Sequence, residues 1–148
     1  STCPYEVRGD GMADKEKMFQ VKIITPDRIF YTGEVEMIEF MTSSGQIGVY
    51  KNHIPLTTVL APGAVMLHEA DGEKVAAVHS GFAEILPEEV TLLAEVAEWP
   101  EEIDESRAEA AKQRAEERLQ AKAANIDLVR AEYSLRRALT RINVKEMK

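Results

Sequence analysis

The sequence changes character near residue 104, and this boundary constrains what the chain can fold into. Residues 19–98 contain short apolar runs separated by Gly, Pro and Asp. From Asp104 to the last residue there is neither Gly nor Pro, and Ala, Glu, Lys, Arg and Leu predominate. That composition is typical of helices. The sequence therefore predicts a strand-rich part followed by a helical part.

The junction between the two parts is the hexapeptide Ile103-Asp104-Glu105-Ser106-Arg107-Ala108. Asp104 is a good helix N-cap, because its carboxylate can accept from the free backbone N–H groups of the first turn. Glu105 favours the positive end of the helix dipole. A helix is expected to begin here, at the point where a movable part would be attached.

The strand-rich part shows period-2 alternation interrupted by turn residues. Its expected strands are residues 19–23, 35–40 with a bulge at Ile38, 65–69, 74–79, 82–86 and 90–96. Ala70-Asp71-Gly72-Glu73 is a strong hairpin turn, since Asp-Gly tolerates positive φ, and Pro87-Glu88 closes another. Many short strands without intervening helices predict an antiparallel β-sandwich, or flattened barrel, over residues 18–100.

The helical part, residues 101–148, is expected to form an antiparallel two-helix hairpin broken near Ala123-Ala124-Asn125. The predicted fold class is therefore α+β. At about 100° per residue, the expected apolar stripes are Ala108, Ala111, Ala115 and Leu119 on the first helix, and Leu128, Ala131, Leu135, Leu139 and Ile142 on the second. Alanine buries little apolar area. The hairpin is accordingly expected to be weakly held and able to separate.

Composition excludes several functional classes. The net charge of −8 argues against a nucleic-acid binder. No apolar run approaches the ~18 residues that cross a bilayer, so we expect no direct membrane insertion. Cys3 is the only cysteine, and the spacing of the three histidines matches no metal motif, so no metal is required. Residues 1–17 lack periodicity and are expected to be a disordered extension or one introduced by cloning.

Enzymatic chemistry is also not indicated. No glycine-rich phosphate loop precedes a helix, and no serine nucleophile elbow is present. His68 and His79 lie in strand patterns, where a structural role is the expected one. The sequence thus predicts that the chain is not an enzyme.

Arginines gather on one face of each predicted helix. Arg107, Arg114 and Arg118 are separated by intervals of seven and four residues, and so are Arg130, Arg137 and Arg141. Like charges at i,i+4 destabilise a helix by about 0.2–0.5 kcal/mol per pair. The pattern therefore favours an external anion that guanidinium groups can bind, either a polyphosphate or an acidic protein surface.

A set of short sequence words points to a known family. They are Val35-Glu36, Gly45-Gln46-Ile47-Gly48-Val49, His53-Ile54-Pro55-Leu56, Pro62-Gly63 and Ser80-Gly81-Phe82-Ala83-Glu84, followed by the junction hexapeptide, which fits an Ile/Leu-Asp-x-x-Arg-Ala nucleotide-binding word. Over residues 18–146 the chain resembles the epsilon subunits of bacterial F-type ATP synthases.

This resemblance implies a non-catalytic rotor subunit of the central stalk in a proton-translocating ATP synthase. Such a subunit couples gamma to the membrane c-ring and inhibits ATP hydrolysis through its C-terminal helices. ATP is the implied regulatory ligand. Its implied contacts are Glu98, Asp104, Arg107, Ala108, Arg114, Arg137 and Arg141.

The resemblance also implies where partners bind. The loop carrying Gln46 is expected to face the ring, and the segment of His53 to lie near gamma. Gln46 replaces the commoner Glu of that loop. Extended helices would contact the alpha and beta subunits, and the implied location is the cytoplasmic face of the bacterial plasma membrane, peripherally bound. The alternative interpretation is a free-standing nucleotide-sensing adaptor whose sandwich binds another protein.

Overall fold

The computed structural model describes residues 17–121 and 125–147. The predicted extension, residues 1–17, lies outside this range except for Lys17. The strands are β1 Phe19–Ile24, β2 Ile29–Val35, β3 Met37–Thr42, β4 Gly45–Tyr50, β5 Leu56–Leu60, β6 Gly63–Glu69, β7 Gly72–Ile85 and β8 Glu89–Glu98. A 3-10 helix (Pro100–Glu102) leads into α2 (Glu105–Gln120), and α3 (Asn125–Met147) follows.

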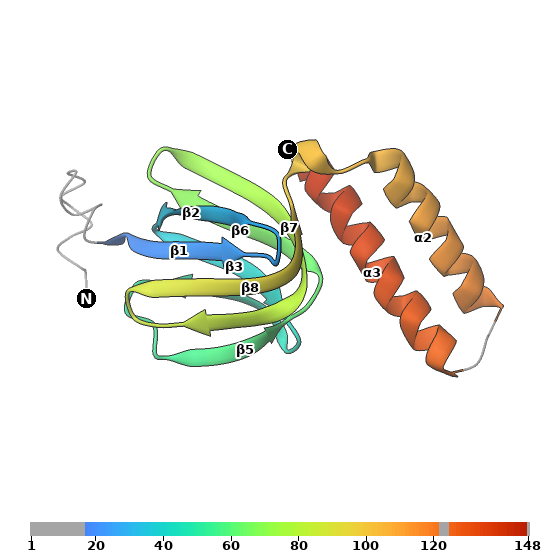
Figure 1. The fold of residues 1–148 in the computed structure, drawn as a ribbon, viewed down its shortest axis with the longest axis horizontal. Helices are drawn as coiled ribbons and strands as arrows, with labels where there is room; N and C mark the ends of the chain where they lie inside the picture. Colours follow the sequence, from blue (N-terminus) through green and yellow to red (C-terminus); the bar gives the residue numbers. More distant parts are fainter. Residues whose placement is uncertain (1–16, 122–124, 148) are drawn as a thin grey trace, which may run out of the picture.

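The strands form a sandwich beside which the two helices lie (Figure 1). Their hydrogen-bonded order is β2-β1-β8-β7-β5-β3-β4, and β6 pairs with both β3 and β7. The predicted sandwich is confirmed, but its strand pairing is not purely antiparallel. β1 pairs with β8 in parallel, from Gln20 opposite Glu89 to Ile24 opposite Leu93. A parallel pair needs a long crossover, and the whole of β2–β7 supplies it.

β7 is one long strand where two were predicted. Its first half pairs with β6 as far as Val78, and its second half pairs with β5 from Gly81 onward. The strand bends between the halves, where Ser80 has φ 45° and Gly81 has φ 138°. These two residues look like a break in the sequence pattern, but they are a corner at which the strand changes partners.

The predicted strand over residues 35–40 is two strands instead. β2 ends at Val35 and β3 begins at Met37, so Glu36 lies at a corner rather than in a bulged strand. The backbone N–H of Glu36 donates to the carbonyl of His68 on β6 (2.8 Å). The change of direction explains why the alternation slips before Ile38.

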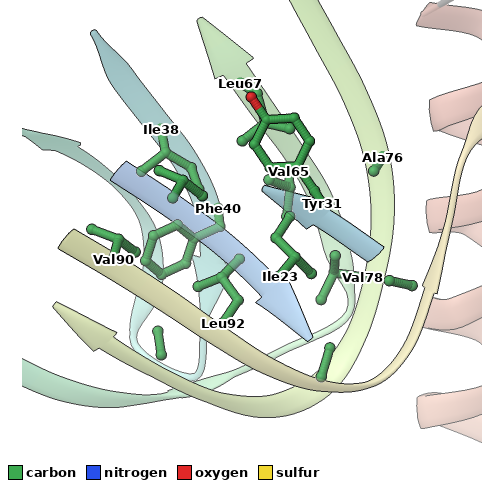
Figure 2. Packing of buried hydrophobic residues seen from close by; sticks show 14 of the residues in the cluster. Ile23, Tyr31, Ile38, Phe40, Val65, Leu67, Ala76, Val78, Val90 and Leu92 are labelled. Carbon is green, nitrogen blue, oxygen red and sulfur yellow. The ribbon is translucent and has the colours of Figure 1, made fainter. Parts of the chain in front are cut away.

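The core lies between the layers of the sandwich. Alternate strand residues point inward, so Ile23, Ile38, Phe40, Leu67 and Leu92 are fully buried. Figure 2 shows these side chains converging from opposite strands. This contiguous apolar cluster stabilises the sandwich, because burial removes apolar surface from water, which contributes about 25 cal/mol per Å².

The hairpin is docked with α3 against β6 and β7, and α2 packs on α3 (Figure 1). Small side chains fill the interhelical seam, as predicted; its buried alanines are Ala108, Ala115, Ala131 and Ala138. The stripe predicted for the second helix is wrong at Leu139, which is 43% exposed, whereas Val144 is buried. The reason is that α3 contacts α2 and the sheet on two different sides, so one stripe cannot describe its burial.

The junction before α2 is fixed to the sandwich. Trp99 stacks on Phe30 with ring centroids 4.4 Å apart. Arg28 Nη2 donates to both carboxylate oxygens of Glu102 at 2.8 and 2.9 Å. Ile103 is only 4% exposed. The last residue held by the sandwich is therefore Ile103, and the next residue begins the hairpin.

Candidate functional site: two arginine-lined clefts

The site begins at the cap of α2. Asp104 has extended backbone angles, and its Oδ1 accepts from the backbone N–H of Arg107 at 3.2 Å. This confirms the predicted N-cap. The cap leaves Ala108 buried in the seam and Arg107 exposed at the start of the helix.

A first cleft opens between the junction and the two helices. Its volume is about 320 Å³, within the roughly 300–1,000 Å³ typical of small-molecule pockets. The lining residues are Glu98, Glu102, Asp104, Arg107, Ala108, Ala111, Arg114 and Arg141.

In the first cleft the acidic side chains have partners, whereas two of the arginines form no ion pair within the described part of the chain. Glu102 is paired with Arg28, and Asp104 with a backbone N–H. Among the residues that the structure describes, Arg107 and Arg114 form no ion pair with a carboxylate. Two guanidinium groups in this cleft are therefore available to an anionic ligand.

Glu98 connects β8 to α3 across the first cleft. Arg141 Nε donates to Glu98 Oε1 at 2.7 Å, and both side chains are about three-quarters buried. Burial acts to raise the pKa of the Glu98 carboxyl, but the neighbouring His79 and Arg141 outweigh it and hold that pKa below its usual value. Glu98 is thus a carboxylate, and it anchors the docked helix through one arginine.

A second cleft, of about 430 Å³, continues between α2 and α3. It shares Ala111, Arg114 and Arg141 with the first cleft and adds Ala115, Arg118, Ser134 and Arg137. Arg137 Nη2 donates to Ser134 Oγ at 3.4 Å, and its guanidinium lies over the Tyr133 ring at 5.3 Å. Four arginines and no acidic side chain line this cleft among the described residues.

The predicted ligand contacts come together in this region. Six of them line the first cleft, and Arg137 lines the adjoining one. Sequence reasoning missed Glu102, Ala111 and Ser134 as lining residues. Ser134 lies one turn before Arg137 on α3, so helical spacing could have indicated it. Arg118 was on the predicted arginine face, whereas Arg130 lines neither cleft.

Gln46 and His53 lie on the sandwich, away from the clefts. Gln46 lies in strand β4 and not in a loop as predicted, because residues 45–50 pair with β3. Its side chain is exposed, and its Nε2 donates weakly to Glu39 Oε1 at 3.5 Å. His53 is half-buried in the β4–β5 connection, where its Nδ1 lies 2.7 Å from the Ile54 carbonyl oxygen. Ile54 itself is 77% exposed. Both positions are therefore accessible to a partner.

Neither a metal nor a membrane is indicated by the geometry. In residues 17–121 and 125–147, no three His, Cys, Asp or Glu side chains gather in an arrangement that could hold an ion. Within the same residues, neither helix combines the length and the hydropathy that spanning a bilayer demands.

The fold is thus that of a two-part protein, a β-sandwich with a docked helical hairpin and polar clefts at the junction between them. Residues 18–100 match the β-sandwich domain of the ATP synthase delta/epsilon chain, and residues 101–146 match its long α-helix domain. The chain belongs to the ATP synthase delta/epsilon chain family.

Individual relatives agree with this assignment. The chain is 46% identical to the ATP synthase epsilon chain of Caldanaerobacter subterraneus over 87% of this chain and 94% of that one. It is 49% identical to the epsilon chain of Halalkalibacterium halodurans over 84% and 94%. A chain in the mitochondrial ATP synthase of Euglena gracilis, solved with OSCP, F1 and c-ring, has the same fold, with a TM-score of 0.74 and 21% identity over 84% of this chain and 79% of that chain.

Proposed function

We propose that this chain is a non-catalytic subunit of the central stalk in a bacterial F-type ATP synthase, and that ATP binds in its two arginine-lined clefts as a regulatory ligand. The observation that carries the proposal is the second cleft, where Arg114, Arg118, Arg137 and Arg141 face a space without acidic side chains. Guanidinium groups match phosphate oxygens in charge and geometry. A polyphosphate is the ligand that best satisfies this arrangement.

The two clefts suggest how ATP is oriented. The phosphates occupy the second cleft, because its lining is cationic. The base and ribose then occupy the first cleft, where Glu98 and Asp104 offer hydrogen-bond acceptors beside the apolar surface of Ala108 and Ala111. Arg114 and Arg141 line both clefts, so they contact the ligand where its two parts join.

ATP would act by favouring the docked hairpin. All the proposed contacts are assembled only while α2, α3 and the junction are together, and the seam that holds the helices is mostly alanine. Without ATP the docked fraction falls, and the helices that separate extend along gamma and offer the same arginines to acidic surfaces of the alpha and beta subunits, which inhibits hydrolysis. Shifting such an equilibrium from 1:99 to 99:1 needs a preference of about 5.5 kcal/mol.

The sandwich would contact gamma and the membrane ring. An exposed apolar row crosses three adjacent strands, from Val59 on β5 through Phe82 on β7 to Leu93 on β8. Contiguous exposed apolar surface is characteristic of a protein interface. We assign this row, with the segment of His53, to gamma and the exposed Gln46 region to the c-ring. The subunit is then bound peripherally at the cytoplasmic face of the membrane.

Replacing Arg107 by alanine tests the nucleotide site without disturbing the fold, because this side chain is exposed and makes no ion pair among the described residues. Loss of one charge-assisted contact to ATP is expected to weaken binding by about 1.5–3 kcal/mol, or roughly 10- to 100-fold. Isothermal titration calorimetry of the purified chain measures this change.

Arg136→Ala is the matched control, since it removes the same charge from an exposed position of α3 that lines neither cleft. Its ATP affinity is expected to remain within about twofold of the unmodified chain, because only long-range, salt-screened charge is lost. Equal losses in both variants would mean that general positive charge, and not the cleft, binds the nucleotide.

A further inference from the structure

His79 occupies an unusual position under the hairpin. Along β7 the side chains of Ala76 and Val78 point into the core, so those of Val75, Ala77 and His79 point to the other face. That face is covered by α3, because Ala77 packs with Val144 and Ile103 in a separate buried cluster. The imidazole of His79 is only 1% exposed. It is therefore sealed between the sheet and the helix.

The ring nitrogens of the buried imidazole have little polar contact within the described part of the protein. Its Nε2 lies 3.4 Å from Glu98 Oε1, beyond the usual 2.7–3.2 Å of a hydrogen bond. Among the described residues, neither ring nitrogen has a hydrogen-bond partner. Burying an unsatisfied polar group is costly, and burying a charged one costs more. Docking of α3 therefore removes His79 from bulk water and leaves its Nε2 only a long contact with Glu98, at 3.4 Å, among the described residues.

Three charged groups face this imidazole. Glu98 on β8 attracts a protonated ring, whereas Arg141 and Arg137 on α3 repel it. The Glu98 carboxylate is already engaged by Arg141 at 2.7 Å, so its charge is shared. Burial is the largest influence and lowers the pKa of His79 below its ordinary value; Arg141 and Arg137 lower it further, and Glu98 opposes them without cancelling the effect.

We propose that His79 is a proton-binding site that opposes docking of the hairpin, so that uptake of one proton by its imidazole favours the separated state. In that state the ring is released from α3 and exposed to water, where it can be protonated freely. Acid would thus release the same helices that ATP retains. The inference rests on the separable hairpin of the proposed function but not on ATP.

The direction of the pH dependence follows from linkage. The imidazole of a solvated histidine has a pKa of about 6.5, and that of docked His79 is lower. Docking is therefore at full strength above about pH 6.5. As the pH falls below this value the separated state gains a proton, and the docking equilibrium constant falls by up to about tenfold per pH unit. The decline stops where docked His79 is itself protonated.

The test is fluorescence energy transfer between one label on the sandwich and one on α3. The labels are placed at exposed positions by Glu34→Cys and Glu132→Cys in a Cys3→Ser background. Without ATP, transfer is expected to decrease from pH 7.5 to pH 5.5 in the otherwise unmodified chain. His79→Gln should make transfer independent of pH over this range, because an amide side chain does not titrate. Unchanged transfer in the parent chain, or an unchanged pH dependence in His79→Gln, would overturn the inference.

His68→Gln is the matched control. His68 on β6 is a second imidazole of the sandwich; it lies 2.8 Å from Glu39 and 2.9 Å from Glu73, and its side chain is 23% exposed rather than sealed. This variant should retain the pH dependence of the parent. If His79→Gln does not fold, a nuclear magnetic resonance titration of the parent replaces it: the His79 ring should titrate together with helix separation, and titration without separation would reject the inference.

The same labelled protein separates this inference from the nucleotide assignment. Its transfer is also recorded on addition of ATP at pH 7.5. A chain that responds to ATP but not to acid rejects only the role of His79. A chain that responds to acid but not to ATP rejects only the nucleotide site.

Discussion

Replacing Gly81 by alanine is expected to destabilise the protein by about 2–6 kcal/mol. Gly81 has φ 138°, a conformation that L side chains rarely adopt, and a Cβ there would lie 2.0 Å from the backbone oxygen of Leu93 and 2.9 Å from Cα of Ala94. Backbone strain of about 1–3 kcal/mol then adds to overpacking of similar size. Because the obstacle is main chain of β8, rotation of a side chain cannot relieve it. Urea unfolding measures the loss.

Gly72→Ala isolates the backbone-strain part of this effect. Gly72 has φ 151°, but nothing lies within 4 Å of the Cβ that alanine would add. Only the backbone strain of about 1–3 kcal/mol should remain. If Gly72→Ala and Gly81→Ala lowered the free energy of unfolding equally, the close approach of β7 and β8 at the corner would be wrong.

Arg141→Ala is expected to have the largest effect on the hairpin. It removes the 2.7 Å bond from α3 to Glu98 and leaves that partly buried carboxylate without its guanidinium partner. An unsatisfied group of this kind costs about 1–3 kcal/mol. The equilibrium constant for docking of the hairpin should therefore fall by roughly one to two orders of magnitude. Because Arg141 lines both clefts, ATP affinity should fall as well.

A double-mutant cycle distinguishes the loss of this pair from a general loss of charge. Glu98→Ala removes the other partner, and the double variant leaves no unpaired charge in the interface. Energy transfer between sandwich and α3 should show that the double variant docks better than the sum of the two single changes predicts. Strict additivity would mean that the Glu98–Arg141 contact does not hold the helix.

Local patterns predicted most of the secondary structure, because strand alternation and helix composition act over a few residues. The Ala70-Asp71 turn occurs where expected. For the helices, α2 ends at Gln120 and α3 begins at Asn125, while Ala123 and Ala124, where the break was predicted, lie outside the described residues. The predictions that were wrong concern features that depend on contacts between residues far apart in the sequence. The parallel pairing of β1 with β8 and the corner at Ser80–Gly81 depend on which strands meet in space. A single glycine such as Gly81 is compatible both with a turn between two strands and with a bend within one strand.

The part of the candidate site that could be predicted is the part whose side-chain positions follow from helix geometry. Spacings of four and seven residues placed the arginines on common faces, and a capping residue at Asp104 followed from its position before α2. The contact of Arg141 with Glu98 joins residues 43 apart, and no local rule indicates it. Burial of His79 is likewise a consequence of docking, since an isolated β7 would expose one of its faces.

The central claim is that ATP binds in the arginine clefts and retains the hairpin on the sandwich. It is tested most directly by titrating the chain labelled at positions 34 and 132 with ATP at pH 7.5 while recording energy transfer. We expect transfer to rise to saturation with ATP, and Arg107→Ala to shift the midpoint to a roughly 10- to 100-fold higher ATP concentration. Transfer that does not change at any ATP concentration, or a midpoint that Arg107→Ala leaves in place, would contradict it.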